Sequence, residues 1–502
     1  MAVIQPFCDI FVNFFEFIII ILPFWSKEYK MPLFHTFLGA PAVKTLLKER
    51  KKLWFIGIGG IHMHALALAC HARGFEVAGS DLHASKTTRA LCAQGIGVQI
   101  GHHPNAVAEY DAAIYTLAIR EDDPEYQAAV RLGIPVLSRA DLLGFLASTY
   151  PCRIAVAGSH GKSTVTAMLA DIFHLAERDP TVFCGAELPC GTAARLGKGE
   201  DCIMEACEYG NSFLALAPTH ALILNVDFDH ADFFADVDSF RDAFSAFAAL
   251  PPKTGTVIFC AEEENAARAA SAARGKRRSF GLSRGDCHAE NLQYVAGRGE
   301  FSLVLDGSSV GTVRLRVPGE HNVKNALAAA LCAADAGVPK ETILRALSAF
   351  RGAARRMEFR GLYHGVQCFD DYAHHPTEIM ASLQSVRQIT PKTGRVFAVF
   401  QPHTYTRTKA FFAEFCKALS AADRVIVADI YPARETDTLG MSAKRLADGI
   451  GAHAAFVGGF AEIAKTLSHE LAPGDTLLVM GAGDIDRLFA QICSNHFTLS
   501  PK

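Results

Sequence analysis

The chain has 502 residues and a formal net charge of −3, with 50% of its residues hydrophobic and 20% charged. One hydrophobic core stops growing near roughly 250–300 residues, so this length predicts about three domains. The nearly neutral charge excludes a strongly basic nucleic-acid-binding protein and gives no sign of attraction to an anionic membrane. None of the 14 cysteines is spaced as C-x-x-C and most lie in apolar stretches, so we expect free thiols and a reducing cytoplasm.

Residues 1–50 are expected to be a leader of uncertain relevance to the function. Residues 10–25 are strongly apolar, but polar residues and a proline interrupt them, and the unbroken run at 17–22 is too short to span a bilayer. The segment also lacks the basic region and small-residue cleavage site of a signal peptide. We therefore expect no stable membrane insertion. Two interpretations of this segment are open. Either translation starts at Met31, so that the residues before it are not native, or the segment is a poorly ordered extension.

From residue 53 onward, short apolar runs alternate with helical patterns, which is typical of parallel α/β sheets. The pattern restarts near residues 150 and 350, and these restarts predict the domain boundaries. Between residues 301 and 317, apolar residues recur at every second position on both sides of Asp306 and Gly307, which predicts a β-hairpin. Strands are expected at 53–56, 75–78, 154–156, 202–204, 222–224, 366–369, 396–399, 425–427 and 477–479.

Residues 158–164 read Gly-Ser-His-Gly-Lys-Ser-Thr, between a predicted strand and a predicted helix. In a P-loop, backbone N–H groups and the helix N-terminus hold phosphate, the lysine reaches the outer phosphates, and a hydroxyl binds Mg²⁺. The spacing is shorter than in the common P-loop motif, because Val156 stands where its first glycine would be. The residue types and their context nevertheless predict a nucleotide-phosphate site.

A second glycine-rich loop, at residues 57–60, gives a weaker signal. It resembles a dinucleotide fingerprint, but His62 replaces the third glycine. Asp81 ends the next predicted strand, about where a ribose-binding acid belongs. NAD, the pyrophosphate of another nucleotide and a purely structural turn all fit this loop. An NAD(P)-dependent oxidoreductase is accordingly the alternative function from a different class.

Acidic and imidazole groups follow the strands that neighbour the predicted P-loop. Glu205 and Glu208 follow one strand, and Asp227, Asp229 and His230 follow the next. Carboxylates at such strand ends are the usual Mg²⁺ ligands of nucleotide sites, so a metal role is expected for at least one of these residues.

Polar loops at 370–376 and 401–407 also follow predicted strands, which predicts a ligand crevice in the last block. Other histidines carry no partner pattern. We expect these to be surface or packing residues: His62, His64, His71, His83, His102 and His103.

Taken together, these motifs resemble the Mur ligase family of peptidoglycan synthesis, from about Trp54 to Ile485. The ordered series comprises GIGG…GSD at 57–81, GSHGKST at 158–164, EACEYGNSFL at 205–214, NVDFDHADFF at 225–234, PGEHNVKNALAAA at 318–330, RRMEF at 355–359, FDDYAHHPTEI at 369–379, FQPHTYTRT at 400–408, DIYPARE at 429–435 and GAGDI at 481–485. The resemblance implies an α/β protein of three domains: a Rossmann-like UDP-binding domain at 51–150, a P-loop-type ATPase domain with a mainly parallel sheet at 151–350, and a Rossmann-like domain at 351–502 that closes over the site.

The resemblance also implies a reaction, and it is strongest for the family member that adds the first amino acid. That member uses ATP and Mg²⁺ to join L-alanine to the lactyl carboxylate of UDP-N-acetylmuramate through an acyl phosphate. The rival within the family is a murein-recycling ligase that adds a tripeptide to the same UDP-sugar. No nucleic-acid partner is implied, and the protein is expected to be a cytoplasmic monomer or homodimer.

Residue roles follow from the matched motifs. The catalytic set is Lys162, Glu205, His230, Arg356 and Asp371, with Arg355 as a second candidate beside the transferred phosphate. The ATP-binding set is Gly158, Ser159, His160, Gly161, Lys162, Ser163, Thr164, Asn322 and Asn325. The metal set is Ser163, Glu205 and His230; the UDP-sugar set is Gly59, Gly60, Ser80 and Asp81; and the amino-acid and muramoyl set is Tyr372, His374, His403 and Arg407. Departures from the family pattern are His62, His64 and Thr404, together with Ser159 and Ser163 in place of threonines.

Overall fold

The structure, a computed structural model, describes residues 37–188, 192–231, 233–433, 435–437 and 439–492 and the backbone of residues 493 and 497–498. The apolar segment and Met31 of the predicted leader lie outside the described residues. The leader nevertheless includes one packed element, helix α2 (Gly39–Leu47). Its Val43 and Leu47 are buried in the core, and the N–H of Leu38 donates to Asp141 at 2.9 Å. The packed part of the chain therefore starts before residue 51.

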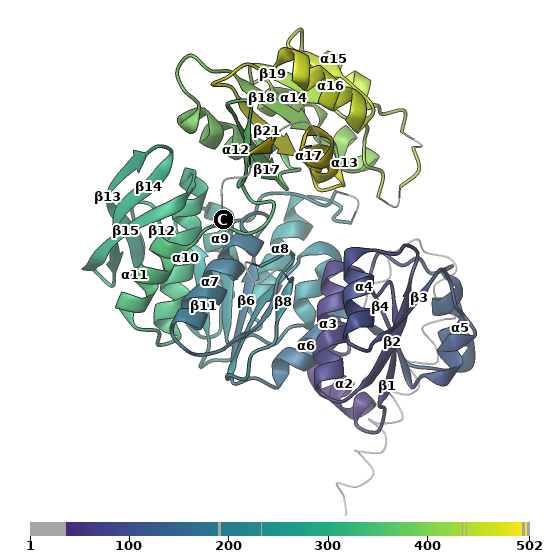
Figure 1. Ribbon diagram of the computed structural model, residues 1–502. Coiled ribbons are helices and arrows are strands. Elements are labelled where there is room, and N and C mark those ends of the chain that lie inside the picture. Colours follow the sequence, from purple (N-terminus) through teal and green to yellow (C-terminus); the bar gives the residue numbers. More distant parts are fainter. Residues whose placement is uncertain are drawn as a thin grey trace, which may run out of the picture. The chain divides into compact units, whose positions relative to one another are not determined.

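The first domain is built on a five-stranded parallel sheet with the order β3-β2-β1-β4-β5; Figure 1 labels β1 to β4 of this sheet. Its strands are β1 (Lys52–Ile56), β2 (Glu76–Asp81), β3 (Gly97–Ile100), β4 (Ala112–Tyr115) and β5 (Val136–Ser138). Its helices are α3 (Ile61–Ala72), α4 (Lys86–Ala93), η1 (Ala106–Glu109), α5 (Pro124–Leu132) and α6 (Arg139–Ser148). Alternation along β1 separates two layers, because Leu53 and Phe55 join the core with α2, α3 and α6, whereas Trp54 and Ile56 join η1 and α5.

The central domain is built on a ten-stranded sheet with the order β15-β14-β13-β12-β11-β10-β6-β9-β7-β8. Its strands are β6 (Cys152–Ala157), β7 (Thr181–Phe183), β8 (Ala194–Arg195), β9 (Asp201–Glu205), β10 (His220–Ile223), β11 (Thr256–Cys260), β12 (Lys276–Gly281), β13 (Cys287–Val295), β14 (Arg298–Leu305) and β15 (Ser308–Pro318). The pairs from β7 through β9, β6, β10, β11 and β12 to β13 are parallel, and β13, β14 and β15 pair antiparallel. The predicted hairpin is confirmed: Asp306 and Gly307 turn between β14 and β15 with φ of 51° and 73°.

Helices cover both faces of the central sheet. They are α7 (Lys162–Leu175), η2 (Tyr209–Ala215), α8 (Val237–Ala248), α9 (Glu264–Ala270), α10 (Glu320–Asp335) and α11 (Lys340–Ala349). Side chains of α7, α10 and α11 share one core, and those of α8, α9 and η2 share another. This second core continues into the first domain, where Gly144 of α6 lies so near the carbonyl of Ala215 that a Cβ would be 2.3 Å from its oxygen. The first two domains therefore pack on a common core.

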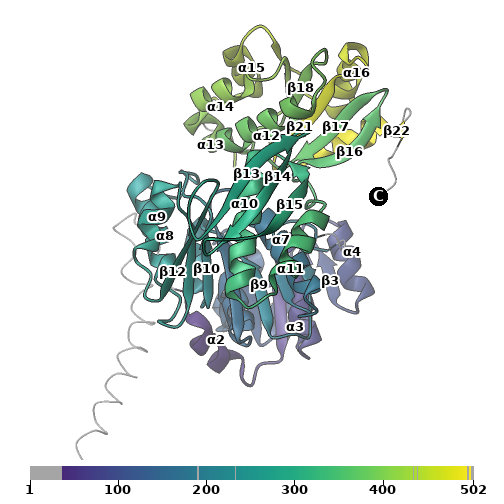
Figure 2. The ribbon, with the colours of Figure 1, turned by 90° about the vertical axis from the view of Figure 1, so that its left-hand side faces the viewer.

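The last domain has a seven-stranded sheet with the order β20-β19-β18-β21-β17-β16-β22; Figure 2 shows β16 beside β17. Its strands are β16 (Glu358–Tyr363), β17 (Val366–Asp371), β18 (Val396–Phe400), β19 (Arg424–Val427), β20 (Ala454–Phe456), β21 (Thr476–Met480) and β22 (Phe497–Thr498). Its helices are α12 (Pro376–Ile389), α13 (Tyr405–Ala410), α14 (Phe412–Leu419), α15 (Ala443–Ile450), α16 (Phe460–Glu470), η3 (Ile485–Arg487) and α17 (Leu488–Cys493). Side chains of α12, α14 and α15 pack on one face of the sheet, and those of α16 and α17 on the other.

Every strand expected from the sequence is present, and the fold is the expected three-domain α/β architecture. Among the histidines expected at the surface or in packing, His71, His83 and His102 are exposed and His64 is buried. The described helices include none that is long and apolar enough to cross a membrane. The described cysteines are all free thiols.

Candidate active site

The predicted P-loop lies between β6 and α7, at the carboxyl edge of the central sheet. Gly158 and Gly161 have φ of 146° and 85°, in the region that favours glycine. A Cβ on Gly161 would lie 2.6 Å from the side-chain oxygen of Asn325, and one on Gly158 would lie 2.9 Å from the Cβ of Leu224. Backbone geometry and close packing therefore both require these two glycines.

Lys162 is folded back over this loop. Its Nζ donates to the carbonyls of Gly158 and Ser159 at 2.5 and 3.1 Å and pairs with the Glu208 carboxylate at 3.0 Å. The two charged side chains are only 14% and 2% exposed. Burial alone would lower the pKa of Lys162, but its neighbours, Glu208 foremost with Cys207 and Glu205, together outweigh burial and the net shift is upward. The amine is therefore a fixed positive charge beside the loop.

An oxygen-rich cluster lies next to the lysine. The Glu205 carboxylate, at the end of β9, accepts hydrogen bonds from the Ser163 hydroxyl at 3.0 Å and from the Gly185 N–H at 2.7 Å. The Ser163 hydroxyl in turn accepts from Nη2 of Arg356 at 3.1 Å. The structure thus brings Ser163 and Glu205 of the predicted metal set into contact. His230 approaches Glu208 instead, with its Nε2 3.5 Å from that carboxylate.

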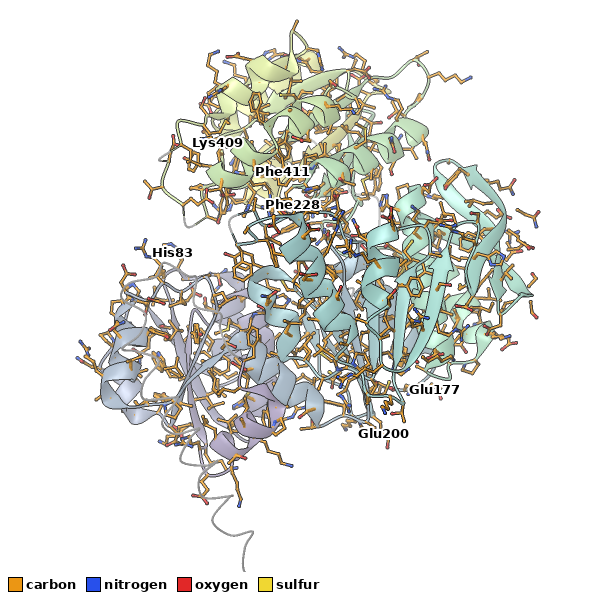
Figure 3. All side chains as sticks on the ribbon, turned by 180° about the vertical axis from the view of Figure 1, so that it is seen from behind. His83, Glu177, Glu200, Phe228, Lys409 and Phe411 are labelled. Atoms are coloured by element: carbon orange, nitrogen blue, oxygen red, sulfur yellow. The ribbon has the colours of Figure 1, made fainter. Side chains whose placement is uncertain are left out.

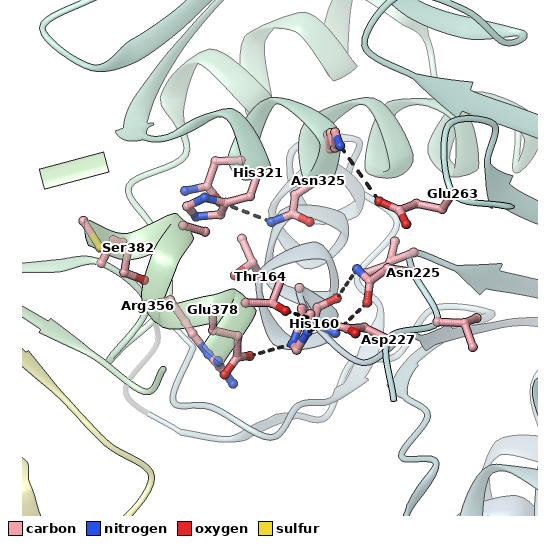
Figure 4. Close-up of a pocket in the computed structure, with 18 of the residues that line it drawn as sticks. His160, Thr164, Asn225, Asp227, Glu263, His321, Asn325, Arg356, Glu378 and Ser382 are labelled. Atoms are coloured by element: carbon pink, nitrogen blue, oxygen red, sulfur yellow. Dashed lines mark hydrogen bonds and ion pairs between the residues drawn. The ribbon is translucent and has the colours of Figure 1, made fainter. Parts of the chain in front are cut away.

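A cavity of about 380 Å³ opens beside the P-loop (Figure 4). The central domain contributes His160, Thr164, Asn322 and Asn325 to its wall, and the last domain contributes Arg356, Asp371 and Glu378. All of these except Glu378 were predicted site residues. Cavities of this size commonly hold small-molecule ligands.

His160 links the two sides of the cavity. Its Nε2 is 3.0 Å from Asp227 and its Nδ1 is 3.1 Å from Glu378, and Asp227 also accepts from the hydroxyl of Thr377 at 2.6 Å. Burial alone would lower the pKa of His160, but the hydrogen bonds to Asp227 and Glu378 outweigh it and raise the pKa to about 9. His160, whose side chain is 16% exposed, is therefore expected to be protonated at pH 7, and it lies between two carboxylates from different domains.

This network predicts a loss of stability at alkaline pH. The pKa of His160 in the folded protein exceeds its ordinary value of 6.5, so its contribution is complete below about pH 6.5 and is lost as the pH rises through about 9. The shift corresponds to roughly 3 kcal/mol at most. In denaturant unfolding, the wild type should lose more stability between pH 7 and 10 than His160→Gln does. The exposed replacement His71→Gln is the control; equal losses in all three proteins would contradict the assignment.

Arg356 and Asp371 form the C-terminal wall of the cavity. Asp371, at the end of β17, accepts hydrogen bonds from the Ala373 N–H at 3.0 Å and the Ser382 hydroxyl at 2.9 Å. Burial raises the pKa of Asp371 to about 6 against the opposing effect of Arg356. In the part of the chain that the structure describes, Nε of Arg356 is buried with no hydrogen-bond partner. A buried donor left unpaired beside a cavity fits an anionic ligand.

Arg355 was the second candidate for contact with phosphate, and the structure directs it elsewhere. Its Nη1 and Nη2 donate to the carbonyls of Gly483 and Gly481 at 3.0 and 2.6 Å, within the last domain. Its φ of 55° is in the left-handed region, so the two neighbouring arginine side chains separate. Their guanidinium groups lie 5.1 and 4.9 Å from the centre of the Tyr372 ring.

The residues predicted to receive the amino acid lie close to one another. The ring of His374 is 5.5 Å from that of Tyr372 and 6.1 Å from that of His403. Nη1 of Arg407 is 3.2 Å from Nδ1 of His403. Burial lowers the pKa of His374 to about 4, so this imidazole is neutral at pH 7. Four residues, from two loops and the start of α13, thus form one polar cluster.

Arg407 also pairs with a residue of the central domain. Its Nε and Nη2 donate to Asp229 at 3.1 and 3.0 Å, and neither side chain is more than 10% exposed. Burial alone would raise the pKa of Asp229, but the surrounding basic side chains, Arg407 among them, lower it well below its usual range. Sequence reasoning had grouped Asp229 with the metal-binding acids, and the structure places it against the amino-acid cluster instead.

The predicted UDP-sugar residues meet at the carboxyl edge of the first sheet. The Gly59 N–H donates to Asp81 at 2.9 Å, and the Gly59 carbonyl accepts from Thr87 at 2.6 Å. Gly60 is the N-cap of α3. Ser80 is buried and donates its hydroxyl to Glu125 at 2.5 Å, so this hydroxyl orders the strand end.

Sequence reasoning missed Glu125, Thr87 and Glu378 as site residues. Glu125 also accepts from the Trp54 indole at 3.0 Å, a contact between residues 71 positions apart that no local pattern could reveal. Glu378 carried a signal, since it follows His375 by three residues and forms a capping box with it at the start of α12.

Comparison with known proteins matches all three domains. Residues 52–151 match the catalytic domain of the Mur ligase family, residues 156–333 match the Mur ligase middle domain, and residues 355–483 match the Mur ligase glutamate ligase domain. The UDP-N-acetylmuramate–L-alanine ligase of Caldanaerobacter subterraneus is 39% identical over 445 residues, covering 88% of this chain and 96% of the relative. The chain belongs to the Mur ligase family. The enzyme of the same name from Agathobacter rectalis is 42% identical over 440 residues, covering 86% and 95%.

Solved structures agree with this membership of the Mur ligase family. The UDP-N-acetylmuramate–alanine ligase of Thermotoga maritima has a TM-score of 0.75 at 28% identity, covering 88% of this chain and 98% of that one. A murein peptide ligase from Psychrobacter arcticus shares the fold with a TM-score of 0.69 at 24% identity, covering 89% and 100%. The predicted family is confirmed, and the oxidoreductase alternative is thereby set aside.

Proposed function

We propose that this Mur ligase joins L-alanine to the lactyl carboxylate of UDP-N-acetylmuramate, with conversion of ATP to ADP and phosphate. The observation that carries the proposal is the identity of 39–42%, over most of the chain, to relatives named for this reaction. The geometry supports it, because Arg356 contacts both the phosphate-type loop, through Ser163, and the polar amino-acid-type cluster, through the ring of Tyr372. Free thiols fit a cytoplasmic enzyme. A monomeric or homodimeric state stays a prediction.

The cavity suits ATP, with the triphosphate beside His160, Gly161 and Thr164 of the P-loop and the base near Asn322 and Asn325. The Ser163 hydroxyl and the Glu205 carboxylate are hard oxygen donors 3.0 Å apart, which fits Mg²⁺. His230, predicted from the sequence as the third residue of that site, lies against Glu208 in the structure, so its role there stays a prediction. Bound there, Mg²⁺ neutralises charge on the phosphate oxygens during transfer.

The metal assignment predicts that Glu205→Gln raises the Mg²⁺ requirement. Losing a ligating carboxylate weakens metal affinity, so the Mg²⁺ concentration for half-maximal activity should rise by at least about tenfold, with partial recovery at high Mg²⁺. Activity would be measured across a Mg²⁺ titration at saturating ATP. Glu187→Gln, an exposed carboxylate paired with Lys86 at 3.3 Å, is the control and should match the wild type. An unchanged requirement in Glu205→Gln would refute the assignment.

The chain's residues account for each step of the proposed reaction. The substrate carboxylate attacks the γ-phosphorus of ATP and ADP leaves, while Lys162 and Arg356 stabilise charge on the transferred phosphoryl group. The amine of L-alanine then attacks the acyl carbon, phosphate departs, and the amine loses a proton. His374 is neutral at pH 7 and can accept a hydrogen bond from that amine. Gly59, Gly60 and Asp81 would hold the UDP portion, with Ser80 ordering the strand end.

The deciding experiment measures phosphate release with UDP-N-acetylmuramate and ATP present and the amine substrate varied. We expect turnover with L-alanine and little with the L-Ala-γ-D-Glu-meso-diaminopimelate tripeptide. Turnover with the tripeptide alone would instead establish the murein-recycling alternative. Omitting UDP-N-acetylmuramate should abolish turnover.

A further inference from the structure

Three consecutive residues after β10 each contact a different part of the last domain. Asp227 accepts from Thr377 at the start of α12 at 2.6 Å. The ring of Phe228 lies 6.4 Å from that of Phe411, and Figure 3 labels both residues. Asp229 pairs with Arg407 on α13. Asp227 and Phe228 already connect the two domains. We therefore look for a role of the buried Asp229–Arg407 pair besides holding the domains together.

The geometry of this pair orients the guanidinium group. The Asp229 carboxylate accepts hydrogen bonds from the Nε–Nη2 edge of the Arg407 guanidinium. Oδ1 lies 3.1 Å from Nε and 3.0 Å from Nη2, and Oδ2 lies 3.2 Å from Nη2. Arginine offers five N–H donors and no acceptor, so Nδ1 of His403 must accept from Nη1. Counting the two Nη2 contacts to the one carboxylate as a single shared N–H, these contacts use three of the five N–H groups. Across the described part of the chain, the remaining two, on Nη1 and Nη2, have no hydrogen-bond partner.

The unused N–H groups belong to a side chain within the cluster of Tyr372, His374 and His403. A carboxylate binds the paired N–H groups of a guanidinium well, and its orientation depends on the guanidinium being held still. L-Alanine carries such a carboxylate beside the amine that must reach the acyl carbon. A misdirected Arg407 would therefore displace the attacking nitrogen.

We propose that Asp229 is a positioning residue for the amino-acid substrate, holding Arg407 by one edge so that its free N–H groups bind the L-alanine carboxylate. The inference rests on the proposed function. Asp229 does not touch the substrate; it acts through Arg407.

The test compares Asp229→Asn with the wild type in steady-state phosphate release. The replacement keeps the shape but removes the charge, and we expect the KM for L-alanine to rise at least about tenfold. The KM for ATP should stay within about twofold. Discrimination between L-alanine and L-alaninamide, which lacks the carboxylate, should decrease. Asp423→Asn, which breaks an exposed pair with Arg387 at 2.7 Å, is the matched control and should change none of these.

A double-mutant cycle separates positioning from a merely structural role. If Asp229 acts through Arg407, the KM for L-alanine of Asp229→Asn/Arg407→Gln should equal that of Arg407→Gln within about twofold. Removing both charges also avoids leaving one buried and unpaired. Additive effects would overturn the proposal. A lower KM in Asp229→Asn would also overturn it, since Asp229 would then compete with the substrate carboxylate.

The outcome for the wild type keeps the two proposals apart. If L-alanine does not increase phosphate release by the wild type, the proposed function is wrong. If the wild type responds and Asp229→Asn has an unchanged KM for L-alanine, only the role of Asp229 fails.

Discussion

Lys162→Met is expected to reduce L-alanine-dependent phosphate release by at least about 10³-fold, the loss that follows when a preorganised charge is removed from a transition state. The structure places the amine in the P-loop, in contact with the Gly158 and Ser159 carbonyls and among the residues that would face the triphosphate. Methionine keeps the length of the side chain and removes its charge. Turnover would be measured at saturating substrate concentrations, so that a weaker affinity for a substrate is not mistaken for a lower kcat.

Stability has to be separated from catalysis in this variant. Lys162 pairs with Glu208, which is only 2% exposed, and breaking a buried ion pair costs about 3–5 kcal/mol because the remaining charge is uncompensated. Lys162→Met/Glu208→Gln removes both charges and should recover most of the lost unfolding free energy. It should not recover turnover. Activity within tenfold of the wild type in either variant would refute the role of Lys162.

Local sequence patterns predicted the local geometry well. Glycines at 158 and 161 and the Asp306–Gly307 turn depend on neighbouring residues, and all appear where the patterns placed them. Contacts between distant residues were beyond reach, because chain topology decides them. Asp229 and Arg407 are 178 positions apart, and nothing near Asp229 distinguishes it from a metal ligand. The packing of α2 on the first domain was missed for the same reason, since its partners lie about 100 residues later.

The adjacent arginines show where residue type stops being informative. Arg355 and Arg356 are chemically identical and both pack on Tyr372, so the motif alone could not say which one faces the phosphate. Backbone dihedrals decide it, since Arg355 has a φ of 55° and turns to the Gly481 and Gly483 carbonyls. Arg356 instead reaches Ser163 of the P-loop.

Arg356→Lys is therefore expected to reduce kcat by about 10²–10³-fold while changing the KM for ATP little. Arg356 donates to Ser163 from Nη2 and keeps a buried, unpartnered Nε beside the cavity, so its fork can hold the P-loop and a transferring phosphoryl group together. Lysine keeps the charge but has no planar fork. Single-turnover measurements of ADP formation would report the phosphoryl-transfer step directly.

Arg355→Lys supplies the matched control, because it makes the same chemical change one residue away. It loses hydrogen bonds to two carbonyls of the last domain, so the free energy of unfolding should fall by about 1–3 kcal/mol while kcat stays within a few-fold of the wild type. The opposite pattern, with kcat lost in Arg355→Lys and kept in Arg356→Lys, would mean that Arg355 faces the phosphate in the working enzyme. Because the two variants differ only in which way the backbone directs the side chain, their comparison tests the geometry of the site rather than its composition.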